Sequence, residues 1–269
     1  MDWDEIVQKS KKMSISPVLI LREKMQKTVL VSLSRMDAFN HIVFQGGTAL
    51  RIFYNNPRFS EDLGFVLKDG ETFELASKTD EIKNYLSSEF YYLQGIRVDT
   101  QKNTRDIQRV VISTVSENPS QKVGINIELF FVPSYRNSPK ILIYPPLNPV
   151  VRVEEKEEIL ADKIIAVVLR RYLKGRDIWD IHYLTDEMNV LTSQELLEKK
   201  IRDYGVGDFQ KRIRESREKL LKEGVDALDR EMKRFMPIST YNQLKISFEE
   251  IVESVAQEIL KYTGKGEEV

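Results

Sequence analysis

The feature that most constrains the fold is a change of pattern near residue 150. Before it, short apolar or alternating segments are separated by turns, as is typical of strands. After residue 154, turn residues become rare and apolar residues recur at helical spacing. The sequence therefore predicts an α+β chain: N-terminal helices over residues 1–40, a mixed β-sheet domain with helices over 41–152 and an α-helical domain over 153–269.

Local patterns predict the main elements. Ser16-Pro17 is a helix start signal, and apolar residues continue at helical spacing to about Phe39. We expect the strands over residues 42–44, 63–67, 96–100, 107–115 and 123–131. We expect the following helices over residues 71–93, 155–172, 176–186 and 193–204.

Composition excludes several kinds of site. The 41 basic and 42 acidic side chains nearly cancel, unlike the strongly basic field of a general nucleic-acid binder. Without cysteine there is no disulfide, Cys-ligated zinc or iron–sulfur cluster. With only His41 and His182, any metal must be held by carboxylates, which favours Mg²⁺ or Mn²⁺. The acidic N-terminus and short apolar stretches predict a cytoplasmic protein without a membrane segment.

A glycine turn stands between a predicted strand and a predicted helix. Gly46 and Gly47 follow the strand, and Thr48 opens the helix. Unpaired backbone N–H groups and the helix dipole at such a turn favour a phosphate, and glycines let a ligand approach closely. Thr48 could cap the helix or bond a phosphate oxygen. An ordinary strand-to-helix turn with a capping threonine would have the same sequence.

Acidic residues follow at places suited to a metal. Asp62, preceded by Ser60 and Glu61, stands at the start of the strand over 63–67. A carboxylate beside a phosphate-binding turn can hold a divalent cation against a triphosphate. Glu128 lies in an otherwise apolar strand, where a carboxylate is costly unless it has a partner or faces a cleft. A metal or a structural salt bridge would each explain Glu128.

The helical half contains a further charged cluster. Lys163 lies in one predicted helix, and Gly175 and Arg176 precede or open the next. Asp177 and Asp180 are three residues apart and share a face of that helix. Gly175 could also end a helix and leave the residues after it in a turn. A surface pair of helices joined by ion pairs would show the same pattern.

Together these segments resemble the AbiEii/AbiGii toxin family over about residues 40–187. The resemblance is carried by Gly46-Gly47-Thr48-Ala49-Leu50, Arg58-Phe59-Ser60-Glu61-Asp62-Leu63, Glu128 in its strand, Glu158-Ile159-Leu160-Ala161-Asp162-Lys163 and the run from Lys174 to Asp180. It implies a nucleotidyltransferase-like fold, a nucleoside triphosphate substrate, a bound metal and an acceptor that in some members is the 3′ end of tRNA. Many members are toxins of type IV toxin–antitoxin systems, so a cognate antitoxin is an implied partner.

The resemblance also implies a role for each candidate residue. The catalytic residues would be Asp62, Lys163 and Asp177. The metal ligands would be Asp62 and Glu128. The nucleotide-binding and supporting residues would be Gly46, Gly47, Thr48, Ser60, Arg176 and Asp180. In this scheme Lys163 contacts the triphosphate, and Asp177 acts as a base or positions the acceptor.

One position departs from the family pattern. The family has a second aspartate two residues after the first, and this chain has Gly64 there. Two-metal chemistry depends on shared carboxylates that hold both ions, so the loss should weaken metal binding and slow transfer. Glu61 cannot replace the missing ligand, because strand alternation points it to the opposite face. Three explanations of Gly64 are open. The site works with one metal held by Asp62 and Glu128, or the chain is a degenerate enzyme that still binds nucleotide. In the third explanation, position 64 carries an altered residue that deactivates the protein.

Three functions follow from these observations. The first is a metal-dependent, toxin-like nucleotidyltransferase, impaired by Gly64. The second is a catalytically degenerate module of the same fold that binds nucleotide, RNA or protein. The third is a phosphotransferase acting on protein, with Ser60 as a site of self-modification.

The helical half contains a candidate surface for binding RNA. The basic residues that could contact an RNA backbone are Lys211, Arg212, Arg214, Arg217, Lys219 and Lys222. Acidic residues interleave with them at helical spacing, which is also typical of a solvated helix: Glu215, Glu218 and Glu223.

Overall fold

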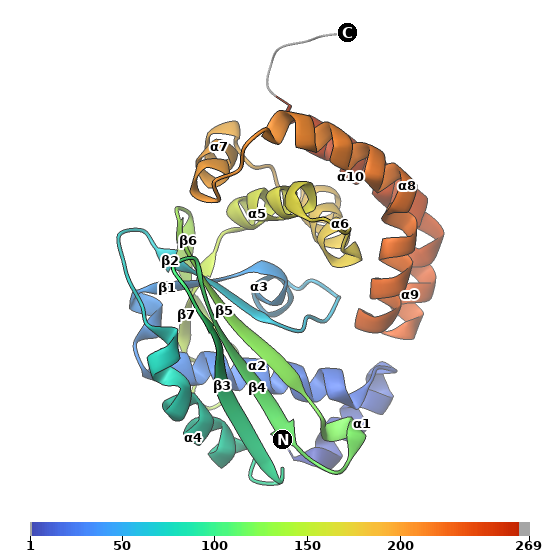
Figure 1. Cartoon of the computed structure of the whole chain (residues 1–269). Helices are drawn as coiled ribbons and strands as arrows, with labels where there is room; N and C mark the ends of the chain where they lie inside the picture. Colours follow the sequence, from blue (N-terminus) through green and yellow to red (C-terminus); the bar gives the residue numbers. More distant parts are fainter. Residues whose placement is uncertain (1, 264–269) are drawn as a thin grey trace. The chain divides into compact units, whose positions relative to one another are not determined.

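Two units divide the chain at Glu155 in the computed structural model, which describes residues 2–263. The first unit, Met1–Glu155, contains the sheet, and the described residues of the second unit, Lys156–Val269, are largely helical (Figure 1). Across the described residues, no helix combines the length and the apolar character needed to span a membrane.

The first unit is built on a seven-stranded mixed sheet with the order β3-β4-β5-β2-β1-β7-β6. The strands are β1 (Ile42–Gln45), β2 (Leu63–Lys68), β3 (Gly95–Asn103), β4 (Ile107–Val115), β5 (Gly124–Ser134), β6 (Asn137–Ile141) and β7 (Val150–Glu154). The β1–β7 and β2–β5 pairs are parallel, and the other neighbours are antiparallel. The predicted mixed sheet is therefore present.

The helices and short 3₁₀ turns of this unit are α1 (Trp3–Met13), α2 (Pro17–Arg35), η1 (Ala38–Asn40), α3 (Gly46–Phe53), η2 (Leu75–Lys78), α4 (Thr79–Glu89) and η3 (Pro119–Gln121). Helix α2, blue in Figure 1, packs against β5, β7 and α4, and α4 packs against β3. The apolar side chains of β2, such as Leu63 and Phe65, are fully buried. Strand alternation places Asp62 and Gly64 on the other face of the sheet from Leu63 and Phe65.

Two predicted segments of this unit differ from the structure. The helix expected over residues 71–93 is only α4, preceded by η2, because His41 holds the first residues in an extended loop. Its Nδ1 lies 2.8 Å from a carboxylate oxygen of Glu71, and its ring stacks on Phe73. Strand β7 runs through the residues expected to link the two domains, and it pairs with β1.

The second unit consists of α5 (Lys156–Leu169), α6 (Gly175–His182), the π-helical turn η4 (Tyr183–Glu187), α7 (Gln194–Asp203), α8 (Phe209–Phe235), α9 (Ile238–Leu244), η5 (Lys245–Ser247) and α10 (Phe248–Leu260). Helix α8 packs against both α6 and α10. Gly175 starts α6 and does not end a helix, which corrects one of the two sequence interpretations. A Cβ at Gly175 would lie 2.1 Å from the carbonyl oxygen of Ala227, so glycine permits the close α6–α8 approach.

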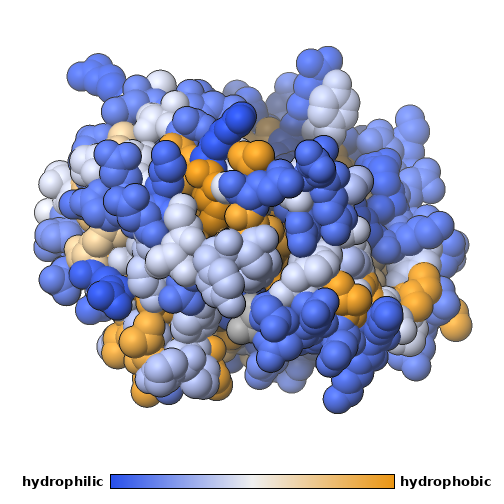
Figure 2. Space-filling model, turned by 90° about the horizontal axis from the view of Figure 1, so that it is seen from below, coloured by the Kyte–Doolittle hydropathy of each residue, from blue (hydrophilic) through white to orange (hydrophobic). Residues whose placement is uncertain are grey.

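Figure 2 shows a face that is largely hydrophilic, with apolar side chains in small separate groups. Single exposed apolar residues are ordinary on a protein surface. The large apolar side chains of β1 and β2, including Phe44 and Phe65, are instead buried in the core of the sheet unit.

Candidate functional site

The glycine turn has the geometry that the sequence predicts for the start of a helix. Gly46 has a φ of +79°, in the left-handed region, and a Cβ there would meet nothing within 4 Å. The N-cap residue Gln45 makes no side-chain capping hydrogen bond. The Thr48 hydroxyl also does not cap the helix: it is buried and donates to the backbone oxygen of Asp62. The backbone N–H groups of the first turn therefore remain the natural anion donors.

The missing side chain at Gly47 makes room for an arginine. A Cβ at this position would lie 2.2 Å from a terminal nitrogen of Arg58 and 3.3 Å from the Ser60 hydroxyl. Arg58 is only 1% exposed, and its guanidinium donates to the backbone oxygen of Phe59 at 3.0 Å. A buried cation thus lies against the first turn of α3 and adds positive charge to the helix N-terminus.

Asp62 immediately precedes β2 and lies beside this turn. Its Oδ1 accepts a hydrogen bond of 2.9 Å from the Asn126 side chain on β5. The neighbouring acid points to the other face, as alternation requires: Glu61 lies 3.4 Å from Arg22 on α2. Gln26 also donates to the backbone oxygen of Glu61 at 2.9 Å. Asp62 is therefore fixed by the chain around it, with its second oxygen available to a ligand.

Glu128 has a partner on the adjacent strand. The Nε atom of Arg109 lies 2.8 Å from Oε1 of Glu128, and a terminal nitrogen lies 2.7 Å from the same oxygen. Arg109 and Glu128 are directly paired in the antiparallel β4–β5 register. This is the structural salt bridge that the sequence left open as an alternative to a metal.

The set of carboxylates needed for a two-metal site lacks one member. Gly64 supplies no ligand, and a Cβ there would lie 2.9 Å from the Gln45 amide nitrogen. Within residues 2–263, no group of three or more Asp, Glu or His side chains is arranged to hold a metal ion. Without a carboxylate at position 64 the donor set around Asp62 fits one ion and not a pair.

In the helical unit, Lys163 joins the two predicted aspartates. Its Nζ lies 2.9 Å from Oδ1 of Asp177 and 2.8 Å from Oδ2 of Asp180. Arg170 forms a second ion pair with Asp177, at 3.1 Å. Both aspartates are buried, which excludes a purely surface arrangement of ion pairs. Arg176 lies apart from this cluster: its backbone N–H donates to Glu231 at 2.7 Å.

A second lysine that pairs with two carboxylates lies between α5 and α7. Lys200 is completely buried, and its Nζ lies 2.9 Å from Glu158 and 3.2 Å from Asp162. Burial raises the pKa of Asp162 above its ordinary value, although Lys200 opposes the shift. This network ties the two helices together and was not predicted from the sequence.

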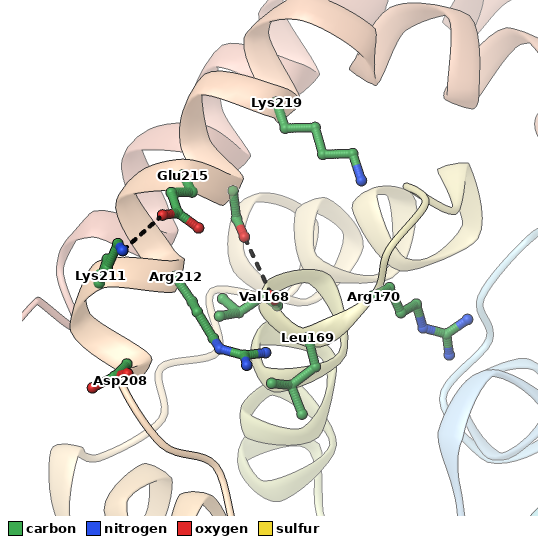
Figure 3. Close-up of a pocket in the computed structure, with 9 residues that line it drawn as sticks. Val168, Leu169, Arg170, Asp208, Lys211, Arg212, Glu215 and Lys219 are labelled. Atoms are coloured by element: carbon green, nitrogen blue, oxygen red, sulfur yellow. Dashed lines mark hydrogen bonds and ion pairs between the residues drawn. The ribbon is translucent and has the colours of Figure 1, made fainter.

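A basic cavity of about 430 Å³ lies between the end of α5 and the start of α8 (Figure 3). Arg212 and Lys219 extend from α8 into this region, whereas Lys211 lies 3.9 Å from Glu215. Arg170 also lines the cavity while pairing with Asp177. The predicted basic stretch is therefore only partly neutralised by its interleaved acids.

Two side chains at these sites, Arg109 and Gln45, were not predicted from the sequence, and Arg58 was part of a recognised motif but had no predicted role. Arg109 had a detectable signal, because it is the one charged residue of β4 and Glu128 is the one charged residue of β5. Opposite single charges on consecutive antiparallel strands suggest a cross-strand pair. The packing of Arg58 on Gly47 has no comparable local signal.

The chain is similar to known proteins over most of its length. One family profile, described as nucleotidyl transferase AbiEii toxin of a type IV TA system, matches residues 28–254. JHP933 from Helicobacter pylori is similar in structure, with a TM-score of 0.54 and 17% identity over 92% of this chain and 96% of that one. MenT4, a nucleotidyltransferase toxin from Mycobacterium tuberculosis, has a TM-score of 0.54 and 14% identity over 98% of this chain and 93% of that one. No curated protein matches in sequence. The α+β nucleotidyltransferase-like fold is confirmed.

Proposed function

Because the chain belongs to the AbiEii family of nucleotidyltransferase toxins, we propose that it transfers a nucleotidyl group from a nucleoside triphosphate to an RNA acceptor. One divalent cation, Mg²⁺ or Mn²⁺, would be held by Asp62. A cognate antitoxin is the protein partner that this family membership suggests.

The placement of Asp62 carries the proposal. The Thr48 hydroxyl bonds the backbone of Asp62, so the carboxylate is tied to the first turn of α3. A carboxylate-held cation and the N–H groups of a helix start are complementary to the phosphates of one nucleotide. Asn126 occupies Oδ1 and thereby orients the carboxylate.

The reaction that these groups support is a displacement at phosphorus. An acceptor hydroxyl oxygen forms a bond to the α-phosphorus, and the bond from that phosphorus to the bridging oxygen of the β-phosphate breaks. Pyrophosphate leaves, and the hydroxyl proton passes to solvent. The N–H groups of Gly46 and Gly47 hold phosphate oxygens, and Arg58 reinforces the positive potential there. A bound cation would supply Lewis-acid stabilisation of the phosphate charge.

For the helical unit, we propose that Lys163 binds a phosphate oxygen through its third N–H donor. Asp177 and Asp180 take the other two donors and so fix the ammonium in one position. Asp177 faces two cations, Lys163 and Arg170, which suits a positioning role better than proton abstraction.

The basic cavity is the proposed contact for the acceptor backbone. Arg212 and Lys219 line the cavity, and Lys219 Nζ lies 5.9 Å from the centre of the exposed ring of Tyr172. Cations that neutralise phosphates provide sequence-independent affinity for RNA, and an exposed aromatic ring can stack on a base. A tRNA 3′ end is one acceptor of this kind.

A label-transfer assay tests the proposal. The chain is incubated with each of the four α-labelled nucleoside triphosphates, Mg²⁺ or Mn²⁺, and total RNA that includes tRNA. We expect label on RNA and a loss of about 100-fold or more in Asp62→Ala, which removes the cation ligand. Glu61→Ala is the matched control, because this neighbouring acid faces α2.

The other outcomes separate the remaining functions. Label that persists in Asp62→Ala would overturn the assignment of the site. Nucleotide binding without transfer to any acceptor would identify a degenerate binding module. Transfer of a γ-phosphate to Ser60 or another protein hydroxyl would identify a phosphotransferase.

A further inference from the structure

One row of side chains crosses four adjacent strands of the sheet on the face that carries Asp62. In the strand register, Gln45 of β1 pairs with Gly64 of β2, and Gly64 pairs with Glu128 of β5. Glu128 in turn pairs with Arg109 of β4. Paired residues of neighbouring strands point to the same face of the sheet. The row therefore consists, in order, of the Gln45 amide, Gly64 without a side chain, the Glu128 carboxylate and the Arg109 guanidinium.

The gap at Gly64 is filled by its neighbour. The side-chain nitrogen of Gln45 lies 2.9 Å from the position that a Cβ at Gly64 would take. The site therefore places a neutral amide where a second carboxylate would bridge two ions, and this amide packs directly against the strand.

The carboxylate in the row is held by an internal cation. Two nitrogens of Arg109 converge on the same oxygen of Glu128, at 2.8 and 2.7 Å. A third nitrogen of Arg109 donates to Gln101 at 3.3 Å, which fixes the guanidinium from the other side. Glu128 and Arg109 are 20% and 33% exposed, so the pair lies near enough to the surface to meet a ligand.

We propose that Arg109 takes the place of a second metal ion, so that the chain binds its nucleotide with one divalent cation at Asp62. Asp62 and Glu128 together carry two negative charges, and Arg109 cancels one of them. A dication bound by Glu128 would be repelled by the guanidinium, a nitrogen of which lies 2.7 Å from Oε1 of that carboxylate. The inference rests on the proposed function only for the presence of a nucleotide, and not on transfer.

The test counts bound ions directly. Mn²⁺ is titrated by electron paramagnetic resonance in the presence of the α,β-methylene analogues of the four nucleoside triphosphates, which cannot transfer a nucleotidyl group. The original chain should bind one Mn²⁺ per nucleotide site, and Asp62→Asn should lose it. Gly64→Asp combined with Arg109→Gln restores a second carboxylate and releases Glu128, and this double variant should bind two.

A matched control keeps the count interpretable. Arg97→Gln removes another arginine from the same β3–β4 hairpin, and it should still bind one Mn²⁺. Circular dichroism and urea midpoints verify that each variant is folded.

Two bound ions in the original chain would overturn the proposal. A single ion in the folded double variant would also overturn it, because Arg109 would then be only a structural partner of Glu128. If the chain binds one Mn²⁺ but transfers no label to any acceptor, the proposed transfer fails while the one-ion site stands.

Discussion

The acidic residues of the sheet unit and those of the helical unit are held in different ways. On the sheet, Asp62 is bonded to an amide and Glu128 to a partly exposed arginine. In the helical unit, two lysines, one partly buried and one fully buried, each lie between two carboxylates. Lys163 joins Asp177 and Asp180, and Lys200 joins Glu158 and Asp162.

This difference suggests that the sheet carboxylates serve ligand binding and that the helical carboxylates serve the stability of the fold. A buried ion pair that loses one partner leaves an uncompensated charge in the core, which is strongly destabilising. A partly exposed carboxylate can lose its charge at little cost to stability, but it can no longer hold a cation. We therefore expect substitutions in the helical networks to unfold the protein and substitutions on the sheet face to affect ligand binding.

The largest expected effect is at Lys200. Replacing it with methionine leaves Glu158 and Asp162 without their shared cation, and breaking a buried pair costs about 3–5 kcal/mol. Urea unfolding measures the loss. Lys199→Met is the control, because the side chain of this neighbour is 42% exposed and its pair with Glu195 should contribute at most about 1 kcal/mol. Equal losses in the two variants would contradict a special role for the buried network.

The sequence predicts the acidic site on the sheet but not the Lys200 network of the helical unit. The sheet site follows from local order, since a strand, two glycines and a helix precede an acid that starts the next strand. Alternation also predicts that Glu61 and Asp62 face opposite ways, and the Glu61–Arg22 pair agrees. The Lys200 network joins residues about 40 positions apart on α5 and α7. No local pattern indicates that pairing.

The unpredicted strands have a similar explanation. Strand β6 contains Pro139, which cannot donate to a ladder, and it lies at the edge of the sheet. Strand β7 lies at the change of sequence pattern near residue 150, and its place beside β1 is fixed by a non-local pairing. Tertiary contacts, rather than local propensity, define both strands.

A smaller loss of stability is expected for Gly175→Ala. The added methyl would overlap the backbone of Ala227, and backbone cannot move aside as a flexible side chain can. Overpacking of this kind costs about 1–3 kcal/mol. Gly207→Ala is the control, because a Cβ there meets nothing within 4 Å. If thermal unfolding of the two variants coincides, the close α6–α8 contact does not contribute as described.

An acid-dependent effect of about 1 kcal/mol or less is expected for Glu23. Burial alone would raise the pKa of Glu23, but Arg51, 2.7 Å away, and Lys27 outweigh it and hold the pKa below the ordinary value of 4.5. The ionised form therefore stabilises the fold above that value, and this contribution is lost as the pH falls through the lowered pKa. Unfolding midpoints between pH 6 and 3 should fall less steeply in Glu23→Gln than in the original chain. Glu117→Gln, at an exposed loop position, should keep the original slope.

The smallest change in stability is expected at Asp62, where the change in function is greatest. Asp62→Asn keeps an oxygen that can accept the Asn126 hydrogen bond, so the free energy of unfolding should shift by no more than about 0.5 kcal/mol. The companion variant Asp180→Asn removes a charge from the buried Lys163 network and should cost several times more. Chemical denaturation of both variants, measured beside Mn²⁺ binding, compares the two units directly. Asp62→Asn should be stable and unable to bind the ion. A large loss of stability in Asp62→Asn would mean that this carboxylate, like those in the helical unit, serves the fold.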